Sequence, residues 1–346
     1  MNKVAISRAI YGNHGNPLDY PGPIIARPVF VSNGYAIELG CSDDFLTFTT
    51  AKGDSLERIL HQRGVPQIQD RVVQIAFGAN RNLENITWKF RNYHHADQAV
   101  NQDFIALPGF LHNADVVACN IGYWGYIYGG LLTGTAEKNL RPYLNETWCP
   151  VTLLLLDTSQ LAAVHRSEGV LMPGQARPGV SCAVSDMDVH LSDSVTCRAQ
   201  VYSLSVPFLS FDGKKPIALE TVKTKGRGDY PALSQQEIFL QINRLLHAEP
   251  FSAGRVPIAE TLAEENARLL RDGALSTRRM SDNALYTSVR NALIKNYSLR
   301  DSDGKIRCGL EDIYPIRTEK TGWEATPKFF PVQAGSADPA RMPPSP

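Results

Sequence analysis

Glu168 is the residue whose type and position best suit catalysis. It comes directly before Gly169, at the end of a short predicted helix that Asp157 and Gln160 begin as an Asp-x-x-Gln capping box. Gly169 would end this helix in a left-handed conformation, so Glu168 takes the last helical position. A carboxylate there meets the negative end of the helix dipole, and partial burial raises its pKa further. We therefore expect Glu168 to act as a general base or proton shuttle near neutral pH; the alternative is a solvated glutamate in the last turn.

A run of small residues forms a second candidate site. The strand predicted at Val72–Phe77 leads directly into Gly78, Ala79 and Asn80. Such a turn exposes successive backbone N–H groups whose dipoles converge on an anion, and small side chains let the anion approach. The segment could bind a carboxylate or phosphate; the alternative is an ordinary turn between a strand and a loop.

Histidine and cysteine spacing does not indicate a metal site. His94-His95 and His165 have no second ligand at recognisable spacing, so we interpret them as surface or core histidines. The six cysteines are scattered without a C-x-x-C pair, which favours buried free thiols. The basic residues Lys214-Lys215 and Lys223–Arg227 are interrupted by Pro and Gly, which favours a solvated loop. We expect no metal.

The composition argues against nucleic acid and membrane as binding partners. The chain has 346 residues, 43% of them hydrophobic, which is enough for one large core or two smaller ones. Lys plus Arg equals Asp plus Glu at 35 each, so no net charge draws the chain toward nucleic acid or anionic lipid. The N-terminus breaks into Gly, Asn and Pro before an apolar stretch develops, and later apolar runs are too short to span a bilayer. We expect a soluble, cytoplasmic protein that binds neither nucleic acid nor membrane.

The elements that position these residues begin with an N-terminal β extension, residues 1–69. Apolar stretches at Ile24–Val31 and Tyr35–Leu39 predict two strands around a turn at Asn33-Gly34. A helix should follow, beginning at Asp54 with Glu57 as its capping partner.

Residues 70–250 are expected to form the central domain. Its short helix should turn Leu161 and Val164 toward the core, and a last helix should begin with the capping box Ser234–Glu237. Strands are predicted at Val72–Phe77, Ile121–Leu132, Val151–Leu156 and Val195–Val206.

The C-terminal part is expected to be helical and then disordered. Residues 251–330 carry two helical patterns, one opening at Pro257 and one following Ser281-Asp282. Residues 331–346 are rich in Pro, Ala and Ser without periodicity, so they cannot bury enough apolar surface to offset the entropy of ordering.

In order and spacing these motifs resemble the gamma-glutamylcyclotransferase superfamily. That family has a Tyr-Gly-Ser-Asn loop after its first strand, a Gly-Gly strand, and an acidic residue before Gly at the end of a short helix. The equivalents here look like Phe77-Gly78-Ala79-Asn80, Gly129-Gly130 and Glu168-Gly169. The resemblance covers roughly residues 70 to 248 and includes Tyr202 in the last strand.

The resemblance implies a mixed β-barrel with flanking helices in an α+β fold. It also implies a small-molecule substrate, a gamma-glutamyl compound, and chemistry that needs no cofactor. Glu168 would accept a proton from the substrate's α-amine, which attacks the side-chain carbonyl to give 5-oxoproline and release an amine or amino acid. The substrate-binding residues implied are Phe77, Gly78, Ala79, Asn80, Gly129, Gly130 and Tyr202.

Departures from the family pattern leave alternatives open. Phe77 and Ala79 replace the usual Tyr and Ser, and the segment Leu171–Ser181 is inserted after the Glu-Gly pair. One alternative is a catalytically inactive small-molecule-binding or interaction module on the same fold. Another is an acyl-transfer enzyme with Cys182 or Cys197 as nucleophile. The oligomeric state, including a homo-oligomer, is also open.

Overall fold

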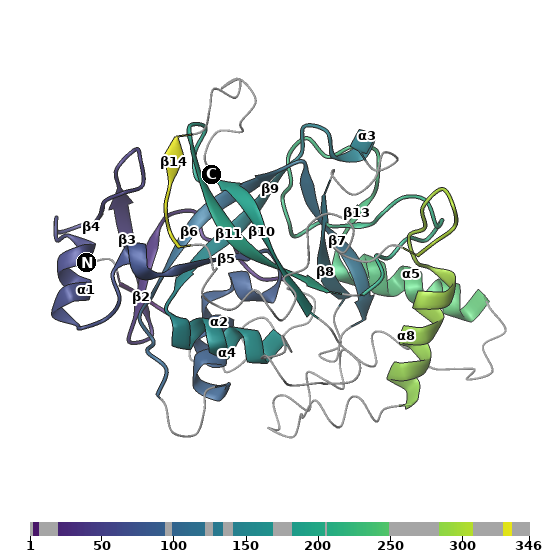
Figure 1. Ribbon diagram of the computed structural model, residues 1–346. Helices are drawn as coiled ribbons and strands as arrows, with labels where there is room; N and C mark the ends of the chain where they lie inside the picture. Colours follow the sequence, from purple (N-terminus) through teal and green to yellow (C-terminus); the bar gives the residue numbers. More distant parts are fainter. Residues whose placement is uncertain are drawn as a thin grey trace.

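The computed structural model describes residues 3–6, 20–93, 99–121, 127–133, 141–168, 182–204, 206–248, 284–306 and 328–333. Within them the chain is a mixed α+β protein with one large mixed sheet and a smaller one (Figure 1). His94-His95, Gly169, the segment Leu171–Ser181 and the helix expected at Pro257 lie outside the described residues, as do residues 334–346 of the expected disordered tail. Within that tail Val332–Gln333 instead forms a short strand.

The strands are β1 (Lys3–Ala5), β2 (Val29–Ser32), β3 (Tyr35–Cys41), β4 (Phe48–Thr50), β5 (Val72–Ala76), β6 (Phe104–His112), β7 (Ala114–Ile121), β8 (Ile127–Thr133), β9 (Trp148–Leu156), β10 (Cys182–His190), β11 (Val195–Leu204), β12 (Ala218–Leu219), β13 (Ala232–Leu233) and β14 (Val332–Gln333). The helices are α1 (Leu56–Gln62), η3 (Ile68–Asp70), η4 (Ala79–Arg81), α2 (Leu83–Asn92), α3 (Arg141–Leu144), α4 (Thr158–Glu168), α5 (Gln235–Ala248) and α8 (Ala284–Asn296).

Strands of the large sheet close into a ring. β6 pairs with β10, β10 with β11, β11 with β5, and β5 with β9, which returns to β6. The β11–β5 pair is parallel and the others are antiparallel, so the ring is mixed. Closure removes free strand edges and encloses a core. The α+β class expected from the sequence is confirmed.

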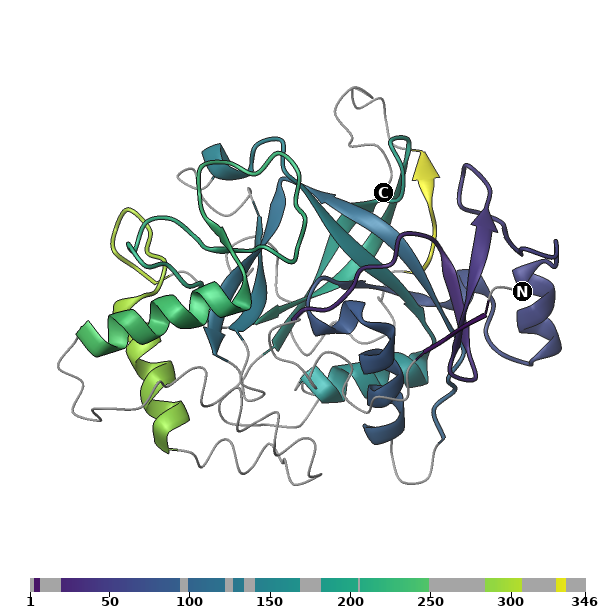
Figure 2. The same ribbon diagram turned by 180° about the vertical axis from the view of Figure 1, so that it is seen from behind.

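Alternation along β5 assigns its residues to two different cores. Val73 and Ile75 belong to the largest hydrophobic cluster, whereas Val72 and Ala76 pack on the opposite face against α2 and α4. Both helices lie on the same side of the central strands in both views (Figures 1 and 2). Leu161 and Val164 of α4 are fully buried in this second cluster, as their helical spacing predicts.

The N-terminal strands extend the same sheet. β2 pairs with β3 through the two-residue turn Asn33-Gly34, and β2 also pairs with β6 of the ring. Both turn residues have positive φ, 51° and 78°, which the right-handed strand twist requires of such a tight hairpin. The helix that follows begins one residue later than expected. Ser55 caps α1, while the Asp54 carboxylate pairs with the Arg58 side chain.

The single strand expected at Ile121–Leu132 is wrong. The structure has an antiparallel hairpin there, in which β7 ends at Ile121 and β8 begins at Ile127. Apolar and aromatic residues continue across this region, so the sequence pattern gave no sign that the chain reverses direction between the two strands. The sequence also failed to predict β6, which contains Pro108 and Gly109, and the polar strand β10.

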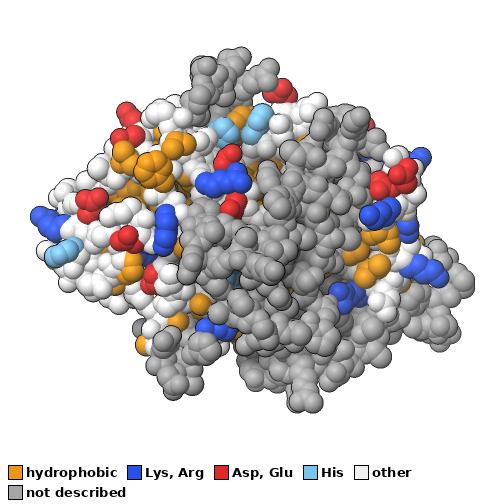
Figure 3. Space-filling model, viewed as in Figure 1, with side chains coloured by type: hydrophobic (Ala, Val, Ile, Leu, Met, Phe, Trp, Pro, Cys, Tyr) orange, Lys and Arg blue, Asp and Glu red, His pale blue; other side chains and the backbone are white. Residues whose placement is uncertain are grey.

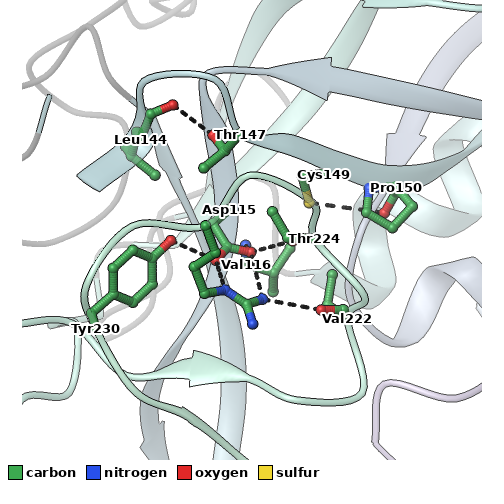
Figure 4. Close-up of polar contacts among 10 residues, drawn as sticks. Asp115, Val116, Leu144, Thr147, Cys149, Pro150, Val222, Thr224 and Tyr230 are labelled. Carbon is green, nitrogen blue, oxygen red and sulfur yellow. Dashed lines mark hydrogen bonds and ion pairs between the residues drawn. The ribbon is translucent and has the colours of Figure 1, made fainter. Parts of the chain in front are cut away.

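The smaller sheet, in the order β13-β12-β7-β8, is held by a buried charge. The Asp115 carboxylate on β7 is fully buried and accepts hydrogen bonds from Arg227 Nε and the Tyr230 hydroxyl, both at 2.6 Å (Figure 4). The Thr224 hydroxyl and the Val116 N–H also donate to it. These contacts fix the chain between β12 and β13. The solvated loop expected for Lys223–Arg227 is therefore wrong for Arg227, whose side chain is 16% exposed.

Surface charges of both signs are interspersed among the described residues on the face shown in Figure 3, and they form no continuous patch of one sign there. Over the described ranges, no helix combines the length and apolar character needed to cross a bilayer. The cytoplasmic location stays a prediction.

We expect Arg227→Met to lower the free energy of unfolding by about 3 to 5 kcal/mol, because it removes one partner of a buried ion pair. Urea unfolding would measure the change. The matched control is Arg198→Met, since Arg198 pairs with Asp188 at 3.0 Å with side chains 48% and 69% exposed. That variant should stay within about 0.5 kcal/mol of the wild type. Equal effects of the two substitutions would contradict the role given to Asp115.

Candidate functional site

Helix α4 places Glu168 by local chemistry that the sequence predicted. The Gln160 N–H donates to Asp157 Oδ1 at 2.8 Å, and the Asp157 N–H donates to Gln160 Oε1 at 2.9 Å. This reciprocal capping box fixes where the helix begins. Eleven residues later Glu168 is its last residue, as expected.

The carboxylate of Glu168 meets the loop that follows β5. Asn80 Nδ2 donates to Glu168 Oε1 at 2.9 Å, although the two residues are 88 positions apart. Asn80 lies in the short helix η4, directly after Gly78 and Ala79. The two segments singled out from the sequence are therefore in direct contact.

Lys89 on α2 completes this contact. Its Nζ donates to Asn80 Oδ1 at 2.6 Å and forms an ion pair with Glu168 Oε1. The Lys89 side chain is 9% exposed and that of Glu168 is 22% exposed, so the lysine lies deeper than the carboxylate. Sequence reasoning missed Lys89. Its signal was a lysine three residues after Ile86 and next to Phe90, on the apolar face of α2.

Lys89 reverses the expected pKa shift of Glu168. Burial by itself raises the pKa of this carboxyl group, but the charge and hydrogen bond of Lys89 and the hydrogen bond from Asn80 outweigh it. The pKa of Glu168 therefore lies below its ordinary value of 4.5, and the raised pKa expected from the sequence is wrong. The expectation included the helix dipole and burial but no cation. Glu168 is ionised at neutral pH.

Tyr202 on β11 contacts His165, which lies about one helical turn before Glu168 on α4. The Tyr202 hydroxyl and His165 Nδ1 share a hydrogen bond of 2.5 Å, and both residues are buried. His165 is the core histidine that the sequence allowed, and its charge contributes to lowering the pKa of Glu168. Tyr202 is thus linked to Glu168 only indirectly, through His165 on the same helix, α4.

The loop from Gly78 to Asn80 offers backbone donors. In the described part of the chain, the N–H groups of Gly78, Ala79 and Asn80 donate to no protein acceptor. Free N–H groups at the start of a helical turn are the groups that bind anions. The Phe77 side chain packs in the largest hydrophobic cluster, and Ala79 packs against the same cluster.

Tyr20 brings Gly78 and Gly129 together. Its hydroxyl accepts the Gly129 N–H at 2.9 Å, and a Cβ added to Gly78 would lie 2.9 Å from the same oxygen. Gly130 has different surroundings, because a Cβ there would lie 2.4 Å from the Sγ atom of Cys119. Close packing therefore requires glycine at positions 129 and 130, and of these two it is Gly129 that contacts Tyr20. Sequence reasoning missed Tyr20, which lies outside the segment that carries the resemblance.

Thiol chemistry receives little support. Cys197 is buried, and burial raises the pKa of its thiol to about 12, so it stays protonated and is a poor nucleophile. The side chain of Cys182 lies outside the described residues. Cys119, Cys149 and Cys197 are buried free thiols as expected, whereas Cys41 is exposed.

Across the described ranges, no three His, Cys, Asp or Glu side chains lie close enough together to hold a metal ion. Comparison of the chain with protein-family models, with curated proteins and with solved structures finds no match.

We expect Lys89→Met to raise the pKa of Glu168 above 4.5, because burial remains while the cation is lost. Titration of carbon-13-labelled glutamate carboxyl groups by NMR would measure this pKa. In the wild type the pKa is lowered, so the stability contributed by Glu168 is present above about pH 4.5 and is lost as the pH falls below it.

The control is Lys215→Met, because Lys215 pairs at 2.7 Å with Asp229, whose side chain is 93% exposed. It should leave the Glu168 titration unchanged. A Glu168 pKa that stays below 4.5 without Lys89 would refute the assigned cause.

Proposed function

We propose that this chain is a gamma-glutamylcyclotransferase-like enzyme in which Glu168 accepts the proton of the substrate's α-amine. One observation carries the proposal: the 2.9 Å hydrogen bond from Asn80 to Glu168 joins the carboxylate to the loop with free N–H groups. A group that binds an anion and a group that binds an ammonium are thereby neighbours. An α-amino acid carries both charges on one carbon atom.

In this proposal the N–H groups of Gly78, Ala79 and Asn80 bind the α-carboxylate of a gamma-glutamyl compound. Its α-ammonium then lies against Glu168, which takes the proton. The neutral amine attacks the γ-carbonyl carbon, so that a new C–N bond closes the 5-oxoproline ring. The bond from that carbon to the leaving nitrogen breaks, and the proton on Glu168 goes to that nitrogen. The ring nitrogen loses its second proton through the same carboxylate, and the leaving group departs as an ammonium ion. Holding the substrate in a folded geometry supplies much of the rate.

The ion pair with Lys89 fits this sequence of steps. In the free protein it keeps Glu168 ionised and ready to attract an ammonium group. When the substrate ammonium takes the place of Lys89 at Oε1, one cation replaces another and Glu168 stays ionised. Transfer of the proton then leaves both groups neutral, and burial favours this neutral pair.

A second function is favoured by the same ion pair. Lys89 and Asn80 together already satisfy Glu168 Oε1, as they would in a structural latch between α2, η4 and α4. The chain would then be a catalytically inactive binding or interaction module on the same fold.

The first function predicts 5-oxoproline release from some member of a panel of gamma-glutamyl amines, amino acids and peptides. Glu168→Gln should lower kcat/KM by at least roughly 100-fold, because the amide cannot accept the amine proton. The control is Glu220→Gln, since the Glu220 side chain is 52% exposed in a loose pair with Lys223. Its activity should equal that of the wild type. Equal activity of Glu168→Gln and wild type would exclude Glu168 as the base.

A thermal-shift screen with the same panel separates the two functions. Stabilisation by a ligand without any 5-oxoproline release would support the binding module.

A further inference from the structure

We propose that the α-amino acid group of the substrate inserts into the ion pair between Lys89 and Glu168, with its α-carboxylate bound to the Lys89 ammonium group. Lys89 thereby selects substrates that carry an α-carboxylate. The inference rests on the proposed function for the position of the α-ammonium group at Glu168. It adds the residue that recognises the opposite charge on the same carbon atom.

The buried charge of Lys89 carries the inference. The Lys89 side chain is 9% exposed, and among the described residues Glu168 is its ion-pair partner. In the proposed reaction the substrate ammonium takes Oε1 of Glu168, so Lys89 loses this counter-charge. A buried ammonium group without a counter-charge is strongly disfavoured. The α-carboxylate arrives on the carbon atom that carries the ammonium, and it restores the balance, because two anions then face two cations.

The hydrogen bonds of Lys89 allow this exchange. An ammonium group has three N–H donors. In the described part of the chain two of them have acceptors, which are Asn80 Oδ1 at 2.6 Å and Glu168 Oε1. Departure from Glu168 therefore leaves two N–H groups without acceptors, while the bond to Asn80 still holds Nζ beside the loop that follows β5.

A buried acceptor on the same helix accounts for one of these two N–H groups. Asn85 is fully buried, and its Nδ2 donates to the Ala79 carbonyl at 3.1 Å, which fixes the orientation of the amide. Its Oδ1 has no hydrogen-bond donor among the described residues, an arrangement that costs free energy. Residues four apart on a helix are neighbours, so Lys89 can donate to Asn85 Oδ1 once it leaves Glu168. The remaining N–H group binds the α-carboxylate.

The competing interpretation is that Lys89 only joins α2 to α4, or only sets the pKa of Glu168. Either role affects every substrate alike, because neither involves the α-carboxylate. A contact between Lys89 and the α-carboxylate instead changes the preference for substrates that have this group over substrates that lack it. The ratio of two kcat/KM values, measured on one enzyme preparation, separates these roles and does not depend on the fraction of folded enzyme.

The test compares a gamma-glutamyl amine with the matching γ-aminobutyryl amine, which lacks the α-carboxylate and cyclises to a pyrrolidinone. We expect the wild type to prefer the gamma-glutamyl compound, and Lys89→Met to reduce this preference roughly 10- to 100-fold, as for a lost hydrogen bond between charged groups. Lys89→Gln, which keeps an N–H donor without the charge, gives the same comparison if Lys89→Met does not fold. The matched control is Lys215→Met, because the side chain of its partner Asp229 is 93% exposed. This control should leave the preference unchanged.

Calorimetry with L-norleucine and pentylamine tests the same contact without turnover, because the two differ only in the α-carboxylate and have no side-chain carbonyl. The wild type should bind norleucine more tightly, and loss of the Lys89 charge should remove this difference.

A wild type without preference for the α-carboxylate, or a preference that survives loss of the Lys89 charge, overturns the inference and leaves the proposed function intact. Norleucine binding that needs Lys89, in a wild type without turnover, overturns the proposed function alone. A wild type that neither binds norleucine nor releases 5-oxoproline overturns both.

Discussion

The ion pair between Lys89 and Glu168 is the constraint on which the candidate site depends. A buried lysine must have a partner, and here it has two, the Glu168 carboxylate and the Asn80 amide oxygen. These contacts join α2, η4 and α4. The apolar faces of α2 and α4 share one hydrophobic cluster, whereas Ala79 of η4 packs against the largest cluster. Packing brings the helices together, and the charges decide which polar atoms face one another. Glu168, in the last turn of α4, thereby has Lys89 as its neighbour, and the pKa of its carboxyl group is lowered.

The protein also contains a carboxylate that is more deeply buried than Glu168, and the comparison shows why Glu168 is the functional candidate. Asp115 is fully buried, and Arg227, Tyr230, Thr224 and a backbone N–H surround it. Such a group has its hydrogen bonds supplied from within the fold and serves to hold a loop. The Glu168 side chain is 22% exposed, and its contacts with Asn80 and Lys89 converge on one oxygen, Oε1.

The N-terminal segment also packs against the loop that begins at Gly78, through Tyr20. Tyr20 lies between Gly78 and Gly129, and neither position would accept a larger side chain without displacement of its neighbours. The two glycines thus permit a close approach of three segments. Arg81 of η4 stabilises this arrangement of segments by donating to the carbonyls of Gly22 and Thr221. The loop with free N–H groups is therefore fixed on several sides before any ligand binds, which favours preorganised recognition.

The sequence alone determined what depends on neighbours three or four residues apart: the capping boxes of α4 and α5, the Asn33-Gly34 turn, and the face that Leu161 and Val164 bury. Tertiary structure decided the rest. The partner of Glu168, the sign of its pKa shift and the place of Tyr20 depend on contacts between residues 79 to 109 positions apart. Local pattern carries no information about such pairs, because whether a buried charge meets a cation depends on how separate elements pack.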